Sequence, residues 1–294
     1  MINKIKLSII IVYFGEKKEV NNLLRSIRKS QTESDYEIIL VNNKVGDDIG
    51  KLLKGQKNIK VVESGGDLGY GKGNNLGAKS AKGKYLLIIN PDTKVIPGSI
   101  DNLVNFLDKN KNAAIAAPNL LDTKGKLFER QGTRLLTPLR AIFSITILSR
   151  IFPGNKYVRD YYMSEIPKSS LREVDFIPGS AFLIRKKVYD QMHGFDKNFF
   201  LYFEEFDLCK RVKEVGWKIY MVPDAVVEHD WEPSEKTPDS KYFAESRFYY
   251  FRKHYGIIWA IVVEFFARLS KKVAFILLLL LTLVIWSILP SESS

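Results

Sequence analysis

Several short stretches of the sequence place carboxylates, amides and a histidine where they could bind a phosphate ester or move a proton. Asp92 follows an apolar run and comes directly after Asn90 and Pro91. A carboxylate in this position could be a hard oxygen ligand for Mg²⁺ or Mn²⁺. It could equally be a turn residue, because aspartate after proline often starts a turn. The local sequence leaves both interpretations open.

Three carboxylates stand together among aromatic residues in the stretch YFEEFDLC, namely Glu204, Glu205 and Asp207. Carboxylates at the start of a helix are stabilised by its dipole, so helix capping alone would explain them. Like charges crowded in apolar surroundings also raise a carboxyl pKa, which suits one of them to act as a general base. His229 ends a later apolar segment, and a histidine in such a place, considered alone, is more often structural than a ligand.

A glycine-rich stretch from Gly66 to Gly73 reads GDLGYGKG and nearly matches a phosphate-binding P-loop. The Ser or Thr that binds magnesium in a P-loop is replaced by Gly73, and the spacing of a dinucleotide site is absent. We therefore do not expect an NTPase or a dinucleotide site, and interpret the stretch as a flexible turn before a helix. Asn74 and Asn75 follow at the expected helix start, where donors can face an anion.

Alternating apolar runs and amphipathic stretches predict the elements that must position these residues. The expected buried strands are 7–14, 37–42, 59–62 and 85–89. The first of these runs is too short for a signal peptide. With helices between them, the strands form βαβ units and a mainly parallel α/β sheet, in which ligands lie beyond the carboxyl ends. Tyr13, Asn42 and Asp92 each end a strand, so we expect them to converge on one crevice.

The second half of the chain lacks this alternation. Residues 122–172 show little regular patterning, and we expect a hairpin or a long loop region there. Helices are expected near 186–192 and from the acidic cluster to Val215, with Gly216 as the C-cap.

Composition narrows the possible function classes. The 294 residues are 46% hydrophobic, which predicts a folded chain with a substantial core. Lys and Arg outnumber Asp and Glu by 45 to 33, and the net charge of +12 indicates anionic partners. No block of like charge or aromatic-interleaved basic motif points to nucleic acid, so none is expected. Cys209 is the one cysteine, which excludes an intramolecular disulfide and a cysteine-cluster zinc site.

The C-terminal part contains seventeen consecutive uncharged residues, 273–289. This length is at the short limit for a membrane-spanning helix. Lys271 and Lys272 precede the run and predict an anchor whose preceding domain stays cytoplasmic. The alternative is a pair of helices that lies in the membrane interface or packs on a partner. The apolar segment 139–152 is either packed on the core or a second interfacial element.

Taken in order, these motifs resemble the family 2 inverting glycosyltransferases, and more narrowly their rhamnosyltransferase-like branch. The matching stretches lie within residues 7–255 and include LSIIIVYFG, YEIILVNN, INPDT, VDFIPGSAFLIRKK and FEEFDLC. The resemblance implies a GT-A glycosyltransferase domain over residues 1–255, with a nucleotide-sugar-binding half (1–121) and an acceptor-binding half (122–255). Residues 256–294 would be a C-terminal membrane-associated helical segment.

The resemblance also implies a site for a nucleoside-diphosphate sugar. The residues that would contact its nucleotide are Tyr13, Asn42, Asn74 and Asn75. Asp92 would be the carboxylate ligand of a divalent metal, Mg²⁺ or Mn²⁺, and His229 a further metal or diphosphate contact. The family usually has Asp at the position of Asn42 and Asn at the position of Asp67.

Glu205 would be the general base, at a position where the family more often has Asp, and Glu204 and Asp207 are the neighbouring acidic candidates. An acceptor hydroxyl would lose its proton to Glu205 and attack the anomeric carbon opposite the diphosphate, which inverts its configuration. The expected function is metal-dependent transfer of a sugar, with rhamnose suggested, to a glycan or polyprenyl-linked acceptor in cell-surface polysaccharide synthesis. The alternatives are a sugar nucleotidyltransferase and an inactive glycan-binding or scaffold relative.

Overall fold

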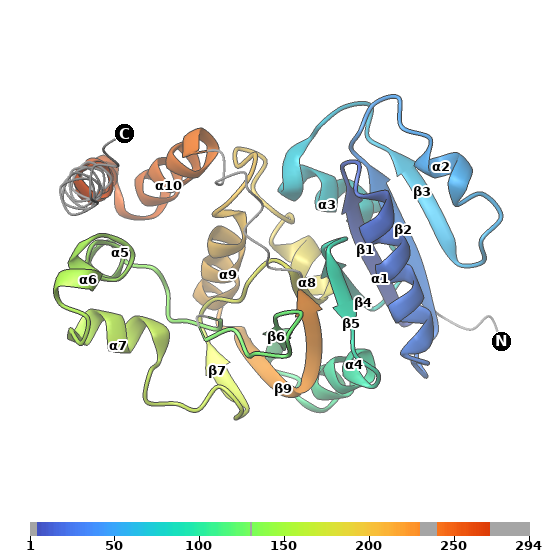
Figure 1. Cartoon of the computed structure of the whole chain (residues 1–294), viewed down its shortest axis with the longest axis horizontal. Helices are drawn as coiled ribbons and strands as arrows, with labels where there is room; N and C mark the ends of the chain where they lie inside the picture. Colours follow the sequence, from blue (N-terminus) through green and yellow to red (C-terminus); the bar gives the residue numbers. More distant parts are fainter. Residues whose placement is uncertain (1–4, 130, 230–239, 271–294) are drawn as a thin grey trace, which may run out of the picture. The chain divides into compact units, whose positions relative to one another are not determined.

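The computed structural model of the chain describes residues 5–129, 131–229 and 240–270 (Figure 1). In chain order, its elements are β1 (Leu7–Tyr13), α1 (Lys17–Lys29), β2 (Tyr36–Asn42), α2 (Ile49–Leu52), β3 (Ile59–Glu63), α3 (Gly69–Ser80), β4 (Tyr85–Ile89), β5 (Thr93–Val95), α4 (Ser99–Lys109), β6 (Ala113–Leu121), α5 (Pro138–Ile145), α6 (Leu148–Ile151), α7 (Lys156–Tyr162), β7 (Arg172–Val174), β8 (Ala181–Arg185), α8 (Lys186–Gln191), α9 (Glu204–Glu214), β9 (Lys218–His229) and α10 (Ser240–Tyr255). A further helical stretch covers residues 257–270.

The chain forms two compact units. The first comprises Met1–Leu135 and Glu165–Ser246, and the second comprises Leu136–Ser164 and Arg247–Ser294. The strands named above all belong to the first unit, whereas α5, α6, α7 and the helix 257–270 belong to the second. The donor-binding half (1–121) and the acceptor-binding half (122–255) inferred from the sequence are defined by function. They do not correspond to these two compact units, and they stay a prediction.

In the described parts of the chain the strands form a nine-stranded mixed sheet. The strand order is β3-β2-β1-β4-β8-β6-β9-β5, and β7 pairs with β9 beside this path. β1 is parallel to both β2 and β4, and β2 is parallel to β3, as the βαβ pattern predicts. Beyond β4 the directions mix, because β8 is antiparallel to both β4 and β6, while β6 and β9 are parallel. The expected α/β class is confirmed.

Helices α1 and α3 cover opposite faces of the central strand β1. Ile9 belongs to the same buried core as Val20 of α1. Ile10 points to the other face, where a Cβ added at Gly77 of α3 would lie 2.6 Å from its Cγ2 atom. The glycine-rich stretch is therefore helical from Gly69 onward rather than a flexible turn, and its glycines let α3 lie close against the sheet.

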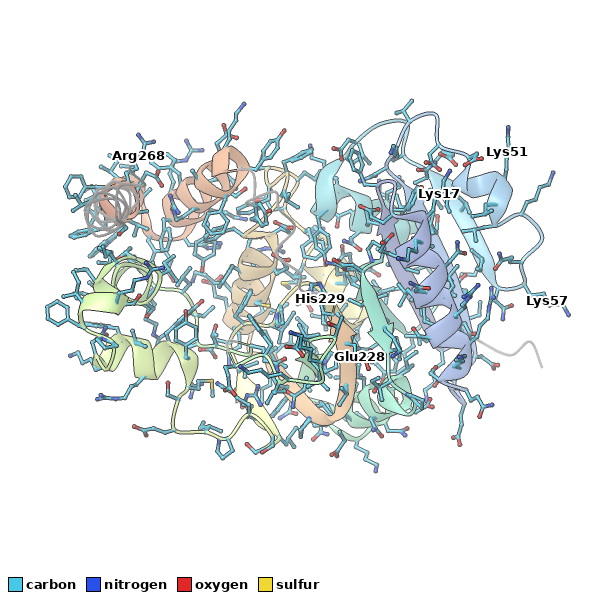
Figure 2. All side chains as sticks on the ribbon, in the orientation of Figure 1. Lys17, Lys51, Lys57, Glu228, His229 and Arg268 are labelled. Atoms are coloured by element: carbon cyan, nitrogen blue, oxygen red, sulfur yellow. The ribbon has the colours of Figure 1, made fainter. Side chains whose placement is uncertain are left out.

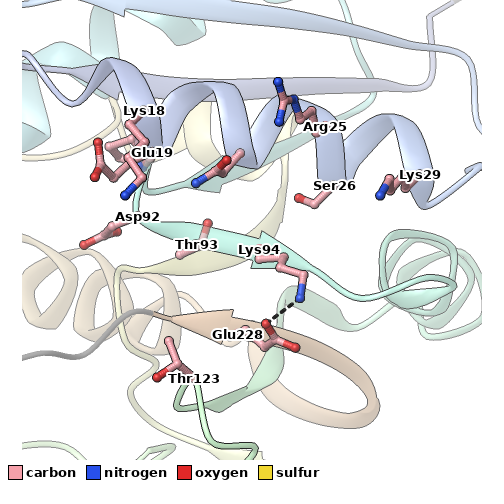
Figure 3. Close-up of a pocket in the computed structure, with 12 residues that line it drawn as sticks. Lys18, Glu19, Arg25, Ser26, Lys29, Asp92, Thr93, Lys94, Thr123 and Glu228 are labelled. Carbon is pink, nitrogen blue, oxygen red and sulfur yellow. Dashed lines mark hydrogen bonds and ion pairs between the residues drawn. The ribbon is translucent and has the colours of Figure 1, made fainter.

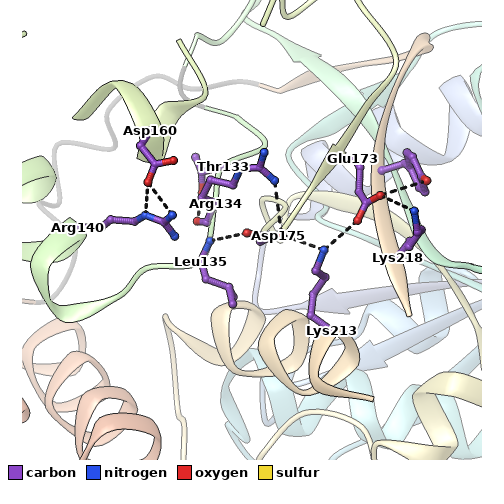
Figure 4. Close-up of polar contacts among 10 residues, drawn as sticks. Thr133, Arg134, Leu135, Arg140, Asp160, Glu173, Asp175, Lys213 and Lys218 are labelled. Carbon is purple, nitrogen blue, oxygen red and sulfur yellow. Dashed lines mark hydrogen bonds and ion pairs between the residues drawn. The ribbon is translucent and has the colours of Figure 1, made fainter. Parts of the chain in front are cut away.

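Residues 122–172 do not form the expected hairpin or long loop, and that prediction is wrong. They contain the three short helices α5, α6 and α7. Thr137 caps α5 by accepting a hydrogen bond from the amide of Arg140, and Pro138 occupies the first turn. Arg140 Nε also donates to Asp160 Oδ2 at 2.8 Å, which joins α5 to α7 (Figure 4). These short helices are stabilised by caps and ion pairs. Their sequence therefore shows no long run of apolar residues at helical spacing.

No helix of the described residues is both long enough and apolar enough to span a membrane. The predicted anchor, residues 273–289, lies outside the described residues and stays a prediction.

Candidate active site

The carboxyl ends of the central strands bring polar side chains to one edge of the sheet. Tyr13 ends β1 and lies opposite Asn42, which ends β2. Asn42 Nδ2 donates to Glu63 Oε2 at 2.9 Å, and its Oδ1 accepts from the amide of Lys44. Burial, together with the nearby carboxylate of Asp47, raises the pKa of the Tyr13 phenol above its usual value. The two residues lie side by side as expected, and their contact with a nucleotide stays a prediction.

Asp92 and His229 lie together beside the short strand β5. β5 pairs antiparallel with β9 so that Thr93 is opposite His229, and the His229 Nε2 atom is 3.4 Å from Asp92 Oδ1. In Figure 2, Glu228 and His229 lie at the end of β9, whereas Lys17 and Lys51 extend from the surface of the first unit.

The chemistry of this pair suits a divalent cation. Asp92 Oδ1 is buried and accepts no hydrogen bond within the described part of the chain. A carboxylate oxygen is a ligand for Mg²⁺ or Mn²⁺, whereas an imidazole nitrogen suits a transition-metal cation better than Mg²⁺. Among the described residues no group of three or more His, Cys, Asp or Glu could hold a metal ion. The two side chains could supply two ligands of a cation, and a bound diphosphate or water would have to supply the others.

A cavity of about 410 Å³ opens beside Asp92, between α1 and β5 (Figure 3). The basic side chains that line it are Lys18, Arg25, Lys29 and Lys94. Lys94 is paired with Glu228 at 2.8 Å. The basic side chains from α1 are spaced at near-integral helical turns and so share one face of that helix. The acidic side chains of Glu19, Asp92 and Glu228 also line the cavity, so its basic residues exceed its acidic ones by one. The basic face of α1 is the part of this lining that suits an anionic ligand.

Glu205 lies in the first turn of α9, directly after a strained stretch of backbone. Tyr202 and Phe203 have φ values of 70° and 66°, a region that bulky residues rarely adopt and that is concentrated at functional sites. Burial raises the pKa of Glu205 to about 7. Burial and the adjacent charge of Glu205 hold the pKa of Glu204 well above its usual value. A carboxyl group that titrates near neutrality can accept a proton at physiological pH.

Asp207 has a different environment from the two glutamates. Its carboxylate is fully buried, and Arg211 Nε donates to its Oδ2 at 2.8 Å. Arg211 also donates to the carbonyl oxygens of Met192 and Gly194, so this pair fastens α9 to the end of α8. We therefore interpret Asp207 as a residue that positions the helix.

The turn before β8 and the start of α3 pack around the Glu205 carboxylate. A Cβ added at Gly179 would lie only 1.9 Å from Glu205 Oε1, so glycine alone leaves room for this carboxylate. The Tyr70 hydroxyl donates to the carbonyl oxygen of Gly179 at 2.6 Å, and the Tyr70 amide donates to that of Phe200 at 3.1 Å. The sequence alone does not single out Gly179 or Tyr70 as site residues. The Pro-Gly dipeptide was the available signal for the first.

Ion pairs and a strand-edge hydrogen bond link the base to the rest of the sheet. Lys213 of α9 contacts Glu173 Oε1 at 3.1 Å and Asp175 Oδ1 at 2.9 Å, which holds α9 against the segment of β7 (Figure 4). The amide of Asn90 donates to the carbonyl oxygen of Ser180 at 2.9 Å. The segment that leads to the predicted metal carboxylate is thus joined directly to the glycine turn beside the predicted base.

Asn75 uses its hydrogen-bonding groups within the protein. Its Nδ2 donates to the carbonyl oxygen of Phe195 at 2.8 Å. Its Oδ1 accepts from the Tyr189 hydroxyl at 2.7 Å and from the Phe195 amide at 2.9 Å. A contact between Asn75 and a nucleotide, which stays a prediction, would use the second N–H of its Nδ2 or replace one of these bonds.

Buried polar atoms without a hydrogen-bond partner gather at this edge of the sheet. Such atoms are rare in folded proteins, and each one calls for an explanation such as a ligand or a water molecule. Of the described residues, those that carry one here are Tyr13, Asn43, Asn74, Asp92 and Glu204. Asn43 is not among the residues predicted from the sequence, although it directly follows the strand whose end indicated Asn42. The set marks this edge as the place where a polar ligand binds.

The chain has clear relatives among known proteins. The family model described as "Glycosyl transferase family 2" matches residues 8–192. The "N-acetylglucosaminyl-diphospho-decaprenol L-rhamnosyltransferase" of Mycobacterium tuberculosis (strain CDC 1551 / Oshkosh) is 26% identical over 235 residues, which are 76% of this chain and 75% of the relative. "Rhamnosyltransferase WbbL" of Escherichia coli (strain K12) is 26% identical over 225 residues, covering 73% of this chain and 80% of the relative.

Solved structures with the same fold include glycosyltransferases with bound nucleotides. The crystal structure of GalNAc-T7 with UDP, GalNAc and Mn²⁺ has a TM-score of 0.62 at 16% identity, and the match covers 84% of this chain and 48% of that one. The chain thus spans about half the length of GalNAc-T7. S. aureus TarS 1-349 in complex with UDP-GlcNAc has a TM-score of 0.51 at 14% identity, covering 83% of this chain and 65% of that one. At these identities the likeness shows the fold alone, which is of the expected GT-A type.

Proposed function

Because the chain belongs to glycosyl transferase family 2, we propose that it transfers a sugar from a nucleoside-diphosphate sugar to a lipid-linked acceptor. The observation that carries this proposal is the carboxyl group of Glu205, whose pKa is raised to about 7. Glu205 lies at the same edge of the sheet as the pair of Asp92 and His229. The hydrogen bond from the Asn90 amide to Ser180 joins the segment of Asp92 to the turn beside Glu205. A proton acceptor and a diphosphate-type site at one edge are the two parts that such a transfer needs.

The donor lies across the carboxyl ends of β1, β2 and β4 in this proposal. Tyr13, Asn42 and Asn74 border its nucleotide, as the family resemblance implies. Support comes from the orphaned polar atoms at this edge and from the basic lining of the cavity beside Asp92. The diphosphate is placed next to Asp92, where positive side chains of α1 offset its charge.

A divalent cation, when bound, would be held by Asp92 Oδ1 and by His229, and it would neutralise charge that develops on the leaving diphosphate. The fit rests on the spacing of 3.4 Å between the two side chains and on the buried, unbonded carboxylate oxygen.

Glu205 takes the proton from the acceptor hydroxyl, and the freed oxygen attacks the anomeric carbon from the face opposite the diphosphate. One displacement of this kind inverts the anomeric configuration. Gly179 leaves the space that the carboxylate occupies, and Tyr70 fixes the turn that contains Gly179. Burial keeps the pKa of Glu205 high enough for efficient proton transfer near neutral pH.

We further propose an L-rhamnosyl donor and an acceptor that is a sugar carried on a polyprenyl diphosphate. The mycobacterial relative is named for both features, and the Escherichia coli relative is named as a rhamnosyltransferase. An acceptor of this type would keep the enzyme at the membrane. The basic pair Lys271 and Lys272, which precedes the uncharged run 273–289, favours a catalytic domain on the cytoplasmic side.

Thermal shift with nucleoside diphosphates tests the donor. The resemblance to rhamnosyltransferases suggests a dTDP-linked donor. We therefore expect dTDP with Mn²⁺ to raise the Tm of the purified protein more than UDP or GDP does, and equal or absent shifts would contradict the rhamnosyl donor. Release of sugar from the donor then separates the alternatives. A sugar nucleotidyltransferase would release pyrophosphate from a nucleoside triphosphate instead, and an inactive scaffold would release neither product. The segment after β1, Tyr13-Phe14-Gly15-Glu16, lacks the basic glycine-rich loop of a nucleotidyltransferase.

A further inference from the structure

The helix 257–270 of the second unit carries apolar side chains on two opposite faces. One face is buried within the protein through Ala260, Val263 and Ala267, which are 1%, 1% and 9% exposed. The other face consists of large apolar side chains that are between 41% and 72% exposed. These residues, called the apolar stripe below, are Ile257, Ile258, Ile261, Phe265 and Leu269.

The stripe is continuous along the helix. At 100° per residue its members fall within an arc of about 120°, and four of them recur at every fourth position. Arg268 lies in the same arc with 75% of its side chain exposed, and it pairs with Glu264 at 2.9 Å. Isolated exposed apolar residues are normal, but a continuous row of five on one helix marks a surface that contacts another apolar phase.

The charges of the second unit indicate which phase this is. Its residues 136–164 and 247–270 contain eight Lys or Arg and two Asp or Glu. A basic helical unit with one exposed apolar face is the pattern of a helix that lies in the interface of an anionic bilayer. The helix 257–270 rises only about 21 Å, too short to span a bilayer, which also favours this orientation. The uncharged run 273–289 follows it directly in the sequence.

We propose that the apolar stripe lies in the headgroup region of an anionic lipid bilayer, parallel to the membrane plane. The proposal rests on the proposed function in one respect only, namely that a lipid-linked acceptor brings the enzyme to a membrane. The apolar stripe is the surface that contacts the membrane in this proposal, whether or not residues 273–289 form an anchor.

Site-specific fluorescence in the full chain tests this proposal. Ile261→Cys and Phe265→Cys are each labelled with an environment-sensitive dye, because the native Cys209 is 1% exposed and so inaccessible to the dye. Leu52→Cys is the matched control, since Leu52 is an apolar residue of the first unit with 52% exposure. The labelled proteins are mixed with phosphatidylcholine vesicles, with and without phosphatidylglycerol, that contain a lipid with a nitroxide on its acyl chain.

We expect the nitroxide lipid to quench the dyes at positions 261 and 265 strongly in vesicles with phosphatidylglycerol, and the dye at position 52 hardly at all. Equal quenching at all three positions, or none at 261 and 265, overturns the proposal. A dye at 261 that is shielded from water before vesicles are added, and stays unquenched afterwards, would show that a second copy or another part of this chain covers the stripe. That outcome also overturns it.

Activity gives a second, separate readout. We expect the double variant Ile261→Ser and Phe265→Ser to lower transfer to a lipid-linked acceptor in vesicles by about tenfold or more, because interfacial binding depends on buried apolar area. Donor hydrolysis in solution should stay at the level of the unsubstituted chain. Unchanged transfer in the double variant contradicts the proposal. If the unsubstituted chain neither hydrolyses nor transfers any donor, the proposed function fails, while the quenching result still decides the membrane contact.

Discussion

The substitution Glu205→Gln should abolish activity and at the same time stabilise the fold above neutral pH. Burial in the folded structure raises the pKa of Glu205 to about 7 from its ordinary value of 4.5. Between these values the folded state binds the proton more strongly than the unfolded state does, so stability falls as pH rises from about 4.5 to 7. A difference of about 2.5 pKa units corresponds to about 3 kcal/mol of unfolding free energy at pH 8. At pH 4 both states are largely protonated, and the difference is only a few tenths of a kcal/mol.

Glutamine keeps the shape of the side chain and removes the charge, so Glu205→Gln should recover most of this free energy. A gain of about 3 kcal/mol corresponds to a rise in Tm on the order of 6 °C for a chain of this size. Thermal unfolding of both proteins at pH 4 and pH 8, at one scan rate, measures the gain. Glu214→Gln is the matched control, because Glu214 is an exposed carboxylate in the same helix. Its effect should stay within about 0.5 kcal/mol at both pH values.

A loss of stability in Glu205→Gln that is the same at pH 4 and pH 8 would refute this reasoning. It would mean that folding does not shift the pKa of Glu205, because only a pKa shift makes the effect of the substitution depend on pH. The raised pKa, and with it the role of Glu205 as the proton acceptor, would then have no support.

Three other substitutions test the surroundings of this residue. Gly179→Ala should lower kcat on the order of 10²-fold with little change in Tm, because the new Cβ displaces the Glu205 carboxylate; normal turnover would show that the carboxylate is free to move. Asp92→Ala should weaken nucleoside-diphosphate binding in the presence of Mn²⁺ and leave it unchanged without metal, and equal affinities in a titration with and without Mn²⁺ would make Asp92 a turn residue. Asp207→Asn should lower the unfolding free energy by about 3 kcal/mol, since it leaves Arg211 without its charged partner; a stable variant without activity would instead assign Asp207 to the chemistry.

The sequence predicted the parallel part of the fold well and the second unit poorly. Buried runs of β-branched residues produce β1 to β4, and this signal depends only on local composition. The helices α5 to α7 depend on specific contacts, such as the cap at Thr137 and the pair of Arg140 and Asp160. Single contacts of this kind leave no periodic pattern, so the segment was predicted as a hairpin or a loop.

The same distinction holds for the site. Asp92 and Glu205 stand in short motifs from which their roles as metal ligand and base are predicted, and the structure places them at one linked edge of the sheet. The partners of these residues come from distant parts of the chain. Tyr70 bonds to a carbonyl oxygen 109 positions away, and Asn75 bonds to one 120 positions away. Contacts at this separation follow from the tertiary fold. The Pro-Gly dipeptide indicates a turn at Gly179, but neither its contact with Glu205 nor the internal bonds of Asn75 could be predicted locally.

The most direct test of the central claim is to measure transfer and to determine the anomeric configuration of the product. The full chain and its Glu205→Gln variant are given a nucleoside-diphosphate sugar, Mn²⁺ and a polyprenyl-diphosphate-linked sugar acceptor, and the product linkage is read by NMR. We expect a product of inverted configuration from the full chain, and at least about 10²-fold slower transfer by the variant with nearly unchanged donor affinity. A product of retained configuration, or near-normal turnover by Glu205→Gln, would contradict the assignment of Glu205 as the base of a single displacement.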